Sequence, residues 1–200
     1  MKSKSVLVAV LLFSLLVFSA MVNAQILALS DNTNDGTANV SASLTSPSDE
    51  DKMIQDYISA GIESEKSAAF DTAILYFNMA IKLRDNCAEA YDHRGMIYVL
   101  TLKFEKAIRD FNKAIKLEPD NAEAYNHRGM ANYCLRQFDL ALRDYSMAIE
   151  MKPGLDKAYY NRGILYLEEG DKDSAFRDLS EAFRMHNQDA AQVIRDFFQE

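Results

Sequence analysis

Tryptophan is absent from this chain, and glycine and proline are scarce, since the 200 residues include seven Gly and three Pro. So few glycines are unusual for a protein of many turns, whereas an apolar fraction of 48% is enough for a sizeable core. Positive charge is also short, because 22 Lys and Arg stand against 30 Asp and Glu. No basic patch that could neutralise phosphates is visible, so we expect no nucleic-acid partner.

Catalytic signatures are missing as well. The sequence contains no nucleophile elbow, no phosphate-binding loop and no zinc-protease motif. Its Asp and Glu residues are scattered at spacings typical of helix surfaces. We therefore predict no catalytic residues and no cofactor, and an enzyme is the least favoured functional class.

The amino end has the pattern of an export signal. Two lysines precede an apolar run over residues 6–22, and Val22-Asn23-Ala24 places small residues where a peptidase would cut before Gln25. We predict a signal peptide over residues 1–24 and no stable membrane insertion after its cleavage. The alternative is an uncleaved anchor, since a run of this length is near the lower limit of about 17 residues that can span a bilayer. Gln25 in place of Cys disfavours a lipoprotein.

Residues 25–53 are rich in Ser, Thr, Asn and Asp and show no apolar period. Such a segment cannot bury enough surface to offset the entropy lost on ordering. We predict a flexible spacer.

The rest of the chain repeats itself every 34 residues. One Tyr, one Gly, two Ala and one bulky apolar residue recur at this spacing. The five series are Tyr57, Tyr91, Tyr125 and Tyr159; Gly61, Gly95, Gly129 and Gly163; Ala73, Ala107, Ala141 and Ala175; Ala80, Ala114, Ala148 and Ala182; and Phe77, Phe111, Tyr145 and Leu179.

This pattern resembles the tetratricopeptide repeat family, whose units carry an aromatic residue at position 4, a small residue at 8, Ala at 20, an aromatic residue at 24, Ala at 27 and Pro at 32. The second and third units match nearly throughout, whereas Asp85 and Asn187 replace the proline of the first and last. The resemblance implies an all-α fold, a right-handed α-solenoid of four helix-turn-helix units. The units are residues 54–87, 88–121, 122–155 and 156–189.

The spacing of small residues supports two packed helices in each unit. Tyr125, Gly129 and Tyr133 lie on one helical face. Gly at position 8 and Ala at position 20 would let the helices approach to about 8–10 Å. We expect the helices to meet at Gly129 and Ala141, so that Gly129 tolerates Ala and rejects Leu.

Residues 190–200 are predicted to form a helix that caps the last unit. Val193, Ile194, Phe197 and Phe198 lie on one side of this segment. A frayed tail is the alternative, which two Phe in eleven residues disfavour.

Arginine recurs at position 7 of the last three units and aspartate at position 23, whereas the first unit has Ala60 and Tyr76 in these places. The joint loss predicts that each Arg pairs with the Asp of its own unit, as its guanidinium can bond a carboxylate bidentately. A basic ladder for an acidic ligand is the less favoured reading. The pairs are Arg94 with Asp110, Arg128 with Asp144, and Arg162 with Asp178.

The resemblance also implies a binding groove, which the first helix of each unit lines in this family. At position 9 an apolar stripe runs through the array, and methionine suits an adaptable binding surface. Part of this stripe could equally be core between units. The predicted groove residues are Ile62, Asp92, His93, Met96, Asn126, His127, Met130, Tyr133, Tyr160, Asn161 and Ile164.

One subfamily binds the carboxyl terminus of its partner through a set of Lys, Arg and Asn residues. Ile58 and Ile62 stand at the positions of its Lys and Asn in the first unit, and Asp92 and Met96 stand there in the second. Asn161 stands where the set has Arg, although Lys157 matches. The departures disfavour a chaperone adaptor of that kind.

His93 and His127 occupy the same position in adjacent units. A metal would need a third ligand, and Ser59 and Asn161 fill this position elsewhere, so we predict no metal site. We expect the histidines to bond groove ligands, and binding to weaken below about pH 6, where an ordinary imidazole becomes charged. The register separates Cys87 from Cys134, so we also predict two free thiols.

The sequence therefore predicts an exported scaffold or adaptor, periplasmic or secreted, that binds a protein or peptide partner through the concave groove of its array. The alternative is a self-associating subunit of an envelope or secretion assembly, which would make the chain a homo-oligomer.

Overall fold

The structure is a computed structural model that describes residues 47–198. Within this range the chain forms nine α-helices and no strand. The predicted signal peptide and residues 25–46 of the predicted spacer lie outside the described residues. The helices are α2 (Pro47–Lys66), α3 (Phe70–Leu83), α4 (Ala88–Leu100), α5 (Phe104–Leu117), α6 (Ala122–Cys134), α7 (Phe138–Met151), α8 (Asp156–Glu169), α9 (Lys172–Arg184) and α10 (Gln188–Phe198).

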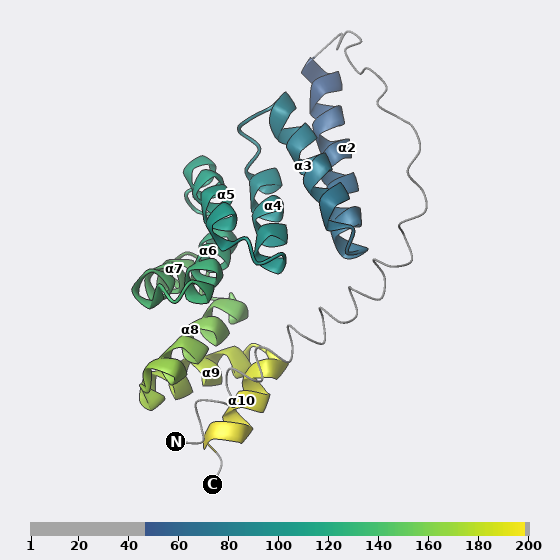
Figure 1. The fold of residues 1–200 in the computed structure, drawn as a ribbon. Helices are drawn as coiled ribbons and strands as arrows, with labels where there is room; N and C mark the ends of the chain where they lie inside the picture. The colour runs from purple at the N-terminus through teal and green to yellow at the C-terminus, as the bar shows by residue number, and fades with distance from the viewer. Residues whose placement is uncertain (1–46, 199–200) are drawn as a thin grey trace. The chain divides into compact units, whose positions relative to one another are not determined.

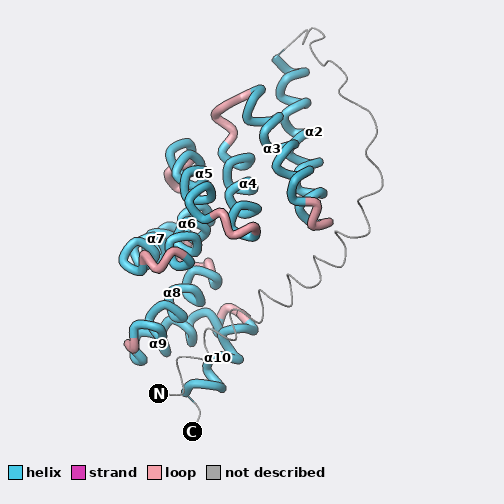
Figure 2. Tube along the Cα trace, in the orientation of Figure 1, coloured by secondary structure: helices cyan, strands magenta, loops and turns pink. Residues whose placement is uncertain are grey.

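Helices α2 to α9 form four successive pairs, and Figure 1 shows the two helices of each pair side by side. The second helix of each pair also packs on the first helix of the next, as α3 does on α4 and α5 on α6. Short loops join the helices (Figure 2). This repeated arrangement confirms the predicted all-α solenoid.

The amino end of α2 differs from the prediction. Because the helix starts at Pro47, residues 47–53 are helical, and the predicted spacer is too long at its carboxyl end. Glu50 lies in the first turn of α2, where negative charge is favoured. Glu50 also pairs with Arg84 at the end of α3, at 3.5 Å, and Asp51 pairs with the same guanidinium. These charges support a helix start that an apolar period cannot detect.

A glycine in each first helix lies against a large side chain of the second helix. A Cβ added at Gly129 would lie 2.7 Å from Cε1 and 2.8 Å from Cδ1 of Tyr145. At Gly61 and Gly95 the corresponding atoms are Cε1 of Phe77 and Phe111, both at 2.6 Å. Real Cβ atoms do not approach so closely, so the helices keep this spacing only with glycine here.

The side chain against Gly129 differs from the one expected, and it changes the expectation for an alanine at this position. The side chain opposite Gly129 is Tyr145 rather than Ala141. The Tyr145 ring is only 1% exposed, so it cannot swing away from an added methyl group. Ala141 is fully buried one helical turn earlier and fills the same interface.

The four loops within the pairs share one backbone feature. Each contains a residue in the left-handed region, and three of these are not glycine: Ala68 and Leu102 at φ 58° and Arg136 at 59°, with Gly170 at 87°. In each loop the next residue donates its N–H to a carbonyl five residues earlier, as Lys103 does to Tyr98 at 2.7 Å. This bonding is the Schellman motif, which satisfies carbonyls at the helix end.

At the carboxyl end of the array, α10 packs on α9. It begins two residues before the predicted capping helix, because the Asn187 side chain accepts a hydrogen bond from the N–H of Ala190 at 2.9 Å. Asparagine is a favoured residue at this position before a helix.

Gly129→Ala is expected to destabilise the array. Overpacking a rigid core costs roughly 1–3 kcal/mol, which outweighs the gain of about 0.5–1 kcal/mol from replacing a helical glycine. Urea unfolding monitored by circular dichroism measures the loss. Gly154→Ala is the matched control, because nothing lies within 4 Å of the added Cβ there. Equal stability of Gly129→Ala and the parent would contradict the contact with Tyr145.

Candidate functional site

The eleven predicted groove residues all lie on first helices, namely α2, α4, α6 and α8. We call the surface that they form the first-helix face. Polar contacts bring members of successive pairs together: Nδ1 of His127 donates to Oδ1 of Asp92 at 3.0 Å, and Nδ2 of Asn161 donates to Oδ1 of Asn126 at 2.9 Å. Both bonds join residues 35 apart in the sequence. One polar link is therefore repeated between neighbouring first helices.

Two further bonds on this face involve carboxylates outside the predicted set. Nδ1 of His93 donates to Oε2 of Glu65 at 2.9 Å, and the hydroxyl of Tyr133 donates to Oε2 of Glu168 at 2.5 Å. Glu65 and Glu168 occupy positions 12 and 13 of their units. In the tetratricopeptide repeat family both positions line the groove. An acidic residue at either position was the sequence signal that could have identified Glu65 and Glu168.

Burial corrects two assignments. Asn126 is 4% exposed and Ile164 is 7% exposed, so neither side chain is accessible to a partner in this conformation. Both belong to the packing between helices. The other nine predicted groove residues are partly exposed.

The two methionines of the predicted stripe lie half in the core. Met96 and Met130 pack against a cluster that includes Val99, Phe111 and Ala131. They therefore combine a partly exposed surface with a structural contact between α4 and α6.

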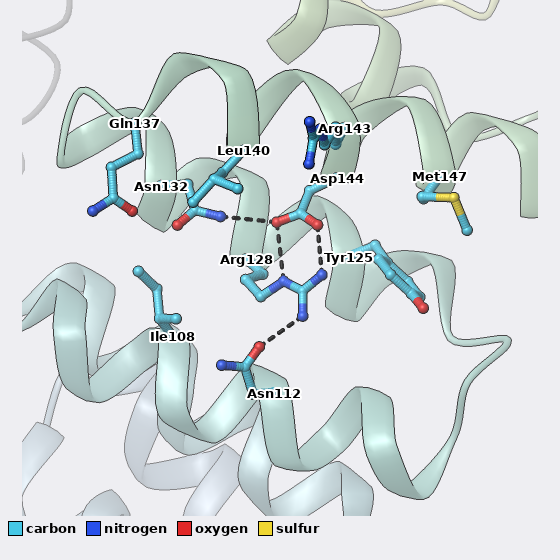
Figure 3. Close-up of a pocket in the computed structure, with 10 residues that line it drawn as sticks. All are labelled: Ile108, Asn112, Tyr125, Arg128, Asn132, Gln137, Leu140, Arg143, Asp144 and Met147. Atoms are coloured by element: carbon cyan, nitrogen blue, oxygen red, sulfur yellow. Dashed lines mark hydrogen bonds and ion pairs between the residues drawn. The ribbon is translucent and has the colours of Figure 1, made fainter.

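A different repeated network joins the first helices to the second helices and is drawn around Arg128 in Figure 3. Nε and Nη2 of Arg128 donate to the two carboxylate oxygens of Asp144 at 3.0 and 2.6 Å. Nη1 donates to Oδ1 of Asn112 at 2.6 Å, and Nδ2 of Asn132 donates to Asp144 at 2.9 Å. The guanidinium carbon lies 5.3 Å from the centroid of the Tyr125 ring, within range of a cation–π contact.

This network recurs in the other two arginine units and confirms that each Arg pairs with the Asp of its own unit. Arg94 bonds Asp110 and Asn78, and Arg162 bonds Asp178 and Ser146. The Asn or Ser that accepts from Nη1 always belongs to the preceding helix pair, 16 residues before the arginine. Each arginine therefore joins two units as well as two helices.

The first unit explains why both charges are lost there together. In the described residues no helix pair precedes α2 and α3. An arginine in place of Ala60 would therefore lack the Asn or Ser partner that the preceding pair supplies in later units. Tyr76 replaces the aspartate, and its ring stacks on Tyr57 with centroids 6.4 Å apart. An aromatic contact substitutes for the ion pair.

A cavity of about 450 Å³ opens beside Arg128 (Figure 3). The Arg128–Asp144 pair lies at its side, and these two charges bond each other. Leu140 and Met147 are exposed at this surface. The lining residues are Ile108, Asn112, Tyr125, Arg128, Asn132, Gln137, Leu140, Arg143, Asp144 and Met147.

Within residues 47–198, no group of three or more His, Cys, Asp and Glu side chains is placed to hold a metal ion. In the same range no helix is long and apolar enough to cross a membrane. Cys87 and Cys134 are both free, as predicted, and burial raises the pKa of both thiols.

The environment of His93 changes the expected pH response. The hydrogen bond to Glu65 raises the pKa of His93, and the charges of Glu65, Asp92 and Glu89 act in the same direction against burial. The Phe77 ring stacks on the imidazole with centroids 5.6 Å apart. The raised pKa means that His93 becomes protonated at a higher pH than an ordinary imidazole, so any response of binding to this residue is expected at a pH above the one predicted from sequence.

Glu65→Gln is expected to lower the pKa of His93 and to destabilise the contact between α2 and α4. Because the folded-state pKa is raised, its contribution to stability is fully present below the unfolded pKa of about 6.5 and is lost as pH rises through the folded pKa. The difference in unfolding free energy between parent and variant should shrink from about pH 6 to about pH 9. NMR titration of His93 and urea unfolding at both pH values measure these effects. Glu63→Gln, exposed on the same helix, is the control, and an equal effect of the two substitutions would contradict the pairing.

Comparison with known proteins identifies the repeat. A family model described as TPR repeat matches residues 103–135, and one described as tetratricopeptide repeat matches residues 156–189. No curated protein sequence matches the chain significantly.

Solved structures share the fold. A crystal structure of MamA has 25% identity and a TM-score of 0.62, covering 69% of this chain and 81% of MamA. PilF of Pseudomonas aeruginosa has 18% identity and a TM-score of 0.64, covering 70% of this chain and 63% of PilF. The first TPR domain of Spaghetti (RPAP3), bound to the HSP90 peptide SRMEEVD, has 22% identity and a TM-score of 0.58. The match covers 60% of this chain and 94% of that domain. The chain therefore contains tetratricopeptide repeats, arranged in a fold typical of protein–protein interaction.

Proposed function

We propose that this chain is an exported scaffold or adaptor that binds a peptide segment of a partner protein on the first-helix face. The observation that carries the proposal is the composition of this face. Met96 and Met130 are partly exposed apolar residues of this face, and the bonded pairs His93–Glu65 and His127–Asp92 lie on the same face. An apolar centre with a polar rim is the usual anatomy of a protein interface.

The peptide is expected to differ from the acidic one bound by the RPAP3 domain. The first-helix face carries Glu65, Asp92 and Glu168, each already bonded to a His or Tyr. Glu89 adds negative charge on α4, whereas Glu123 on α6 is paired with Lys152. A second carboxylate-rich chain would meet like charges here, which disfavours binding. We therefore propose a partner segment that is apolar at its centre and not acidic.

Export rests on the amino-terminal pattern, and its test is the first residue of the mature protein. Amino-terminal sequencing of the exported product is expected to begin at Gln25, because Val22 and Ala24 occupy positions −3 and −1 before the cut. Residues 1–24 found intact on a membrane-bound product would instead indicate an anchored protein.

Binding on the first-helix face is tested by Met96→Glu combined with Met130→Glu. Two carboxylates in an interface that excludes water are costly, so capture of the partner from the native envelope by crosslinking should fall at least about tenfold. The matched control is Met79→Glu with Met147→Glu, which makes the same change at exposed methionines of α3 and α7.

Circular dichroism and thermal melts must accompany both variants, because Met96 and Met130 also contact the core. The proposal predicts that the first variant stays helical and loses the partner while the control keeps it. Loss of the partner in the control alone would place the binding site on the second helices.

A further inference from the structure

Two residues on each second helix, seven apart, face the next pair of helices. On α3 these are Ile74 and Ile81, which pack with Ala90 and Ile97 of α4. On α5, Ile108 packs in one cluster with Ala131 of α6. On α7, Leu142 packs with Leu165 of α8, and Ile149 packs with Ala158. All these side chains are partly or fully shielded by the following pair, and they form the apolar contact between units.

On α9 the same two positions hold larger residues that stay exposed. Phe176 is 45% exposed and Phe183 is 52% exposed. Helix α10 covers them incompletely: the Phe198 ring lies 5.1 Å from that of Phe176, while Phe197 is itself 38% exposed. Phe176, Phe183 and Phe197, here called the aromatic patch, are the three exposed aromatic side chains among residues 47–198.

Helix α10 begins as the first helix of a further unit would begin. Asn187 accepts from the N–H of Ala190 at 2.9 Å, just as Asn121 accepts from the N–H of Ala124 at 3.0 Å before α6. Within the described residues, however, no helix follows α10 to complete a further pair. In the described residues, the two positions of α9 that would contact a following unit therefore remain exposed.

The opposite end of the array is polar. The first helices α4, α6 and α8 meet the preceding pair through fully buried apolar residues: Ala90, Ala124 and Ala158 at position 3, and Ile97, Ala131 and Leu165 at position 10. On α2 these positions hold Asp56 and Glu63, both exposed. Stacking the aromatic patch of one copy on α2 of another would bury two carboxylates without partners, which is costly.

We propose that the aromatic patch joins two copies of this chain tail to tail, about a two-fold axis through α9 and α10. A two-fold contact covers the patch with itself and closes at two copies, whereas head-to-tail stacking forms a larger ring or an open filament. The charges beside the patch are of both signs, with Asp173 and Arg177 on α9 and Arg195 and Asp196 on α10. Such a surface can meet its own copy without net repulsion.

The size of the patch sets the expected strength. A fully buried Phe contributes about 150–250 Å², so three half-exposed rings offer on the order of 300 Å². A standard interface buries about 800 Å² on each partner. Polar neighbours on α9 and α10 must supply the rest, and the dimer should exchange with monomer at accessible concentrations. It would carry two first-helix faces, which doubles the number of partner segments that one particle can bind. The proposal does not depend on the partner proposed above.

Sedimentation equilibrium of the purified protein over a range of concentrations tests the proposal. The average mass is expected to rise from one chain to two and no further. Phe183→Ser, or Phe176→Ser with Phe183→Ser, should raise the dissociation constant at least about tenfold, because apolar burial is lost. Leu75→Ser is the matched control on α3, where Leu75 is 52% exposed, and it should leave the dissociation constant unchanged.

Circular dichroism checks that each variant stays helical. A parent that remains monomeric throughout, a species that grows beyond two chains, or an equal effect of Leu75→Ser and Phe183→Ser would each overturn the tail-to-tail contact. Partner capture by the monomeric Phe183→Ser variant separates the two proposals, because it is retained if the first-helix face binds the partner independently of the dimer.

Discussion

The contact between a glycine of each first helix and a large side chain of the second sets the spacing on which the array depends. Gly61, Gly95 and Gly129 each leave room for a ring that a methyl group would displace. With the helices at this distance, the alanines of the two Ala series are completely buried and add no bulk. The same spacing lets a guanidinium on the first helix reach a carboxylate on the second, so the arginine networks depend on the glycines.

Two sets of polar contacts then join neighbouring units, one on each side of the array. From the first helix α6, Arg128 reaches two second helices, bonding Asp144 of its own unit and Asn112 of the unit before it. On the first helices, His127 and Asp92 bond each other across 35 residues. Because every link reaches only the adjacent unit, stability is expected to be a sum of local terms. Several residues that resemble binding residues in sequence are thus committed to holding the units together.

The two ends of the described array are finished in opposite ways. On α2, Asp56 and Glu63 replace the small and apolar residues of later units, and a terminal repeat with a polar face is what a soluble array requires. On α9, Phe176 and Phe183 replace isoleucine and leucine and remain exposed although α10 packs beside them. A capping helix with an apolar side was predicted here from Phe197 and Phe198. Only the tertiary structure shows that this helix leaves Phe176 and Phe183 exposed.

The sequence by itself determined the 34-residue period, the helical pairs, the pairing of Arg128 with Asp144 and the free thiols, because a periodic pattern defines which helix face is apolar and which residues recur together. Tertiary structure decided the rest. Asn112 and Asp144 both lie 16 residues from Arg128, and only the packing of adjacent units shows that the guanidinium reaches both. Burial removes Asn126 and Ile164 from the accessible face, and Glu65 raises the pKa of His93. These outcomes depend on which side chains of adjacent units lie close enough to bond or to bury each other. A repeating sequence pattern does not give those distances for individual residues.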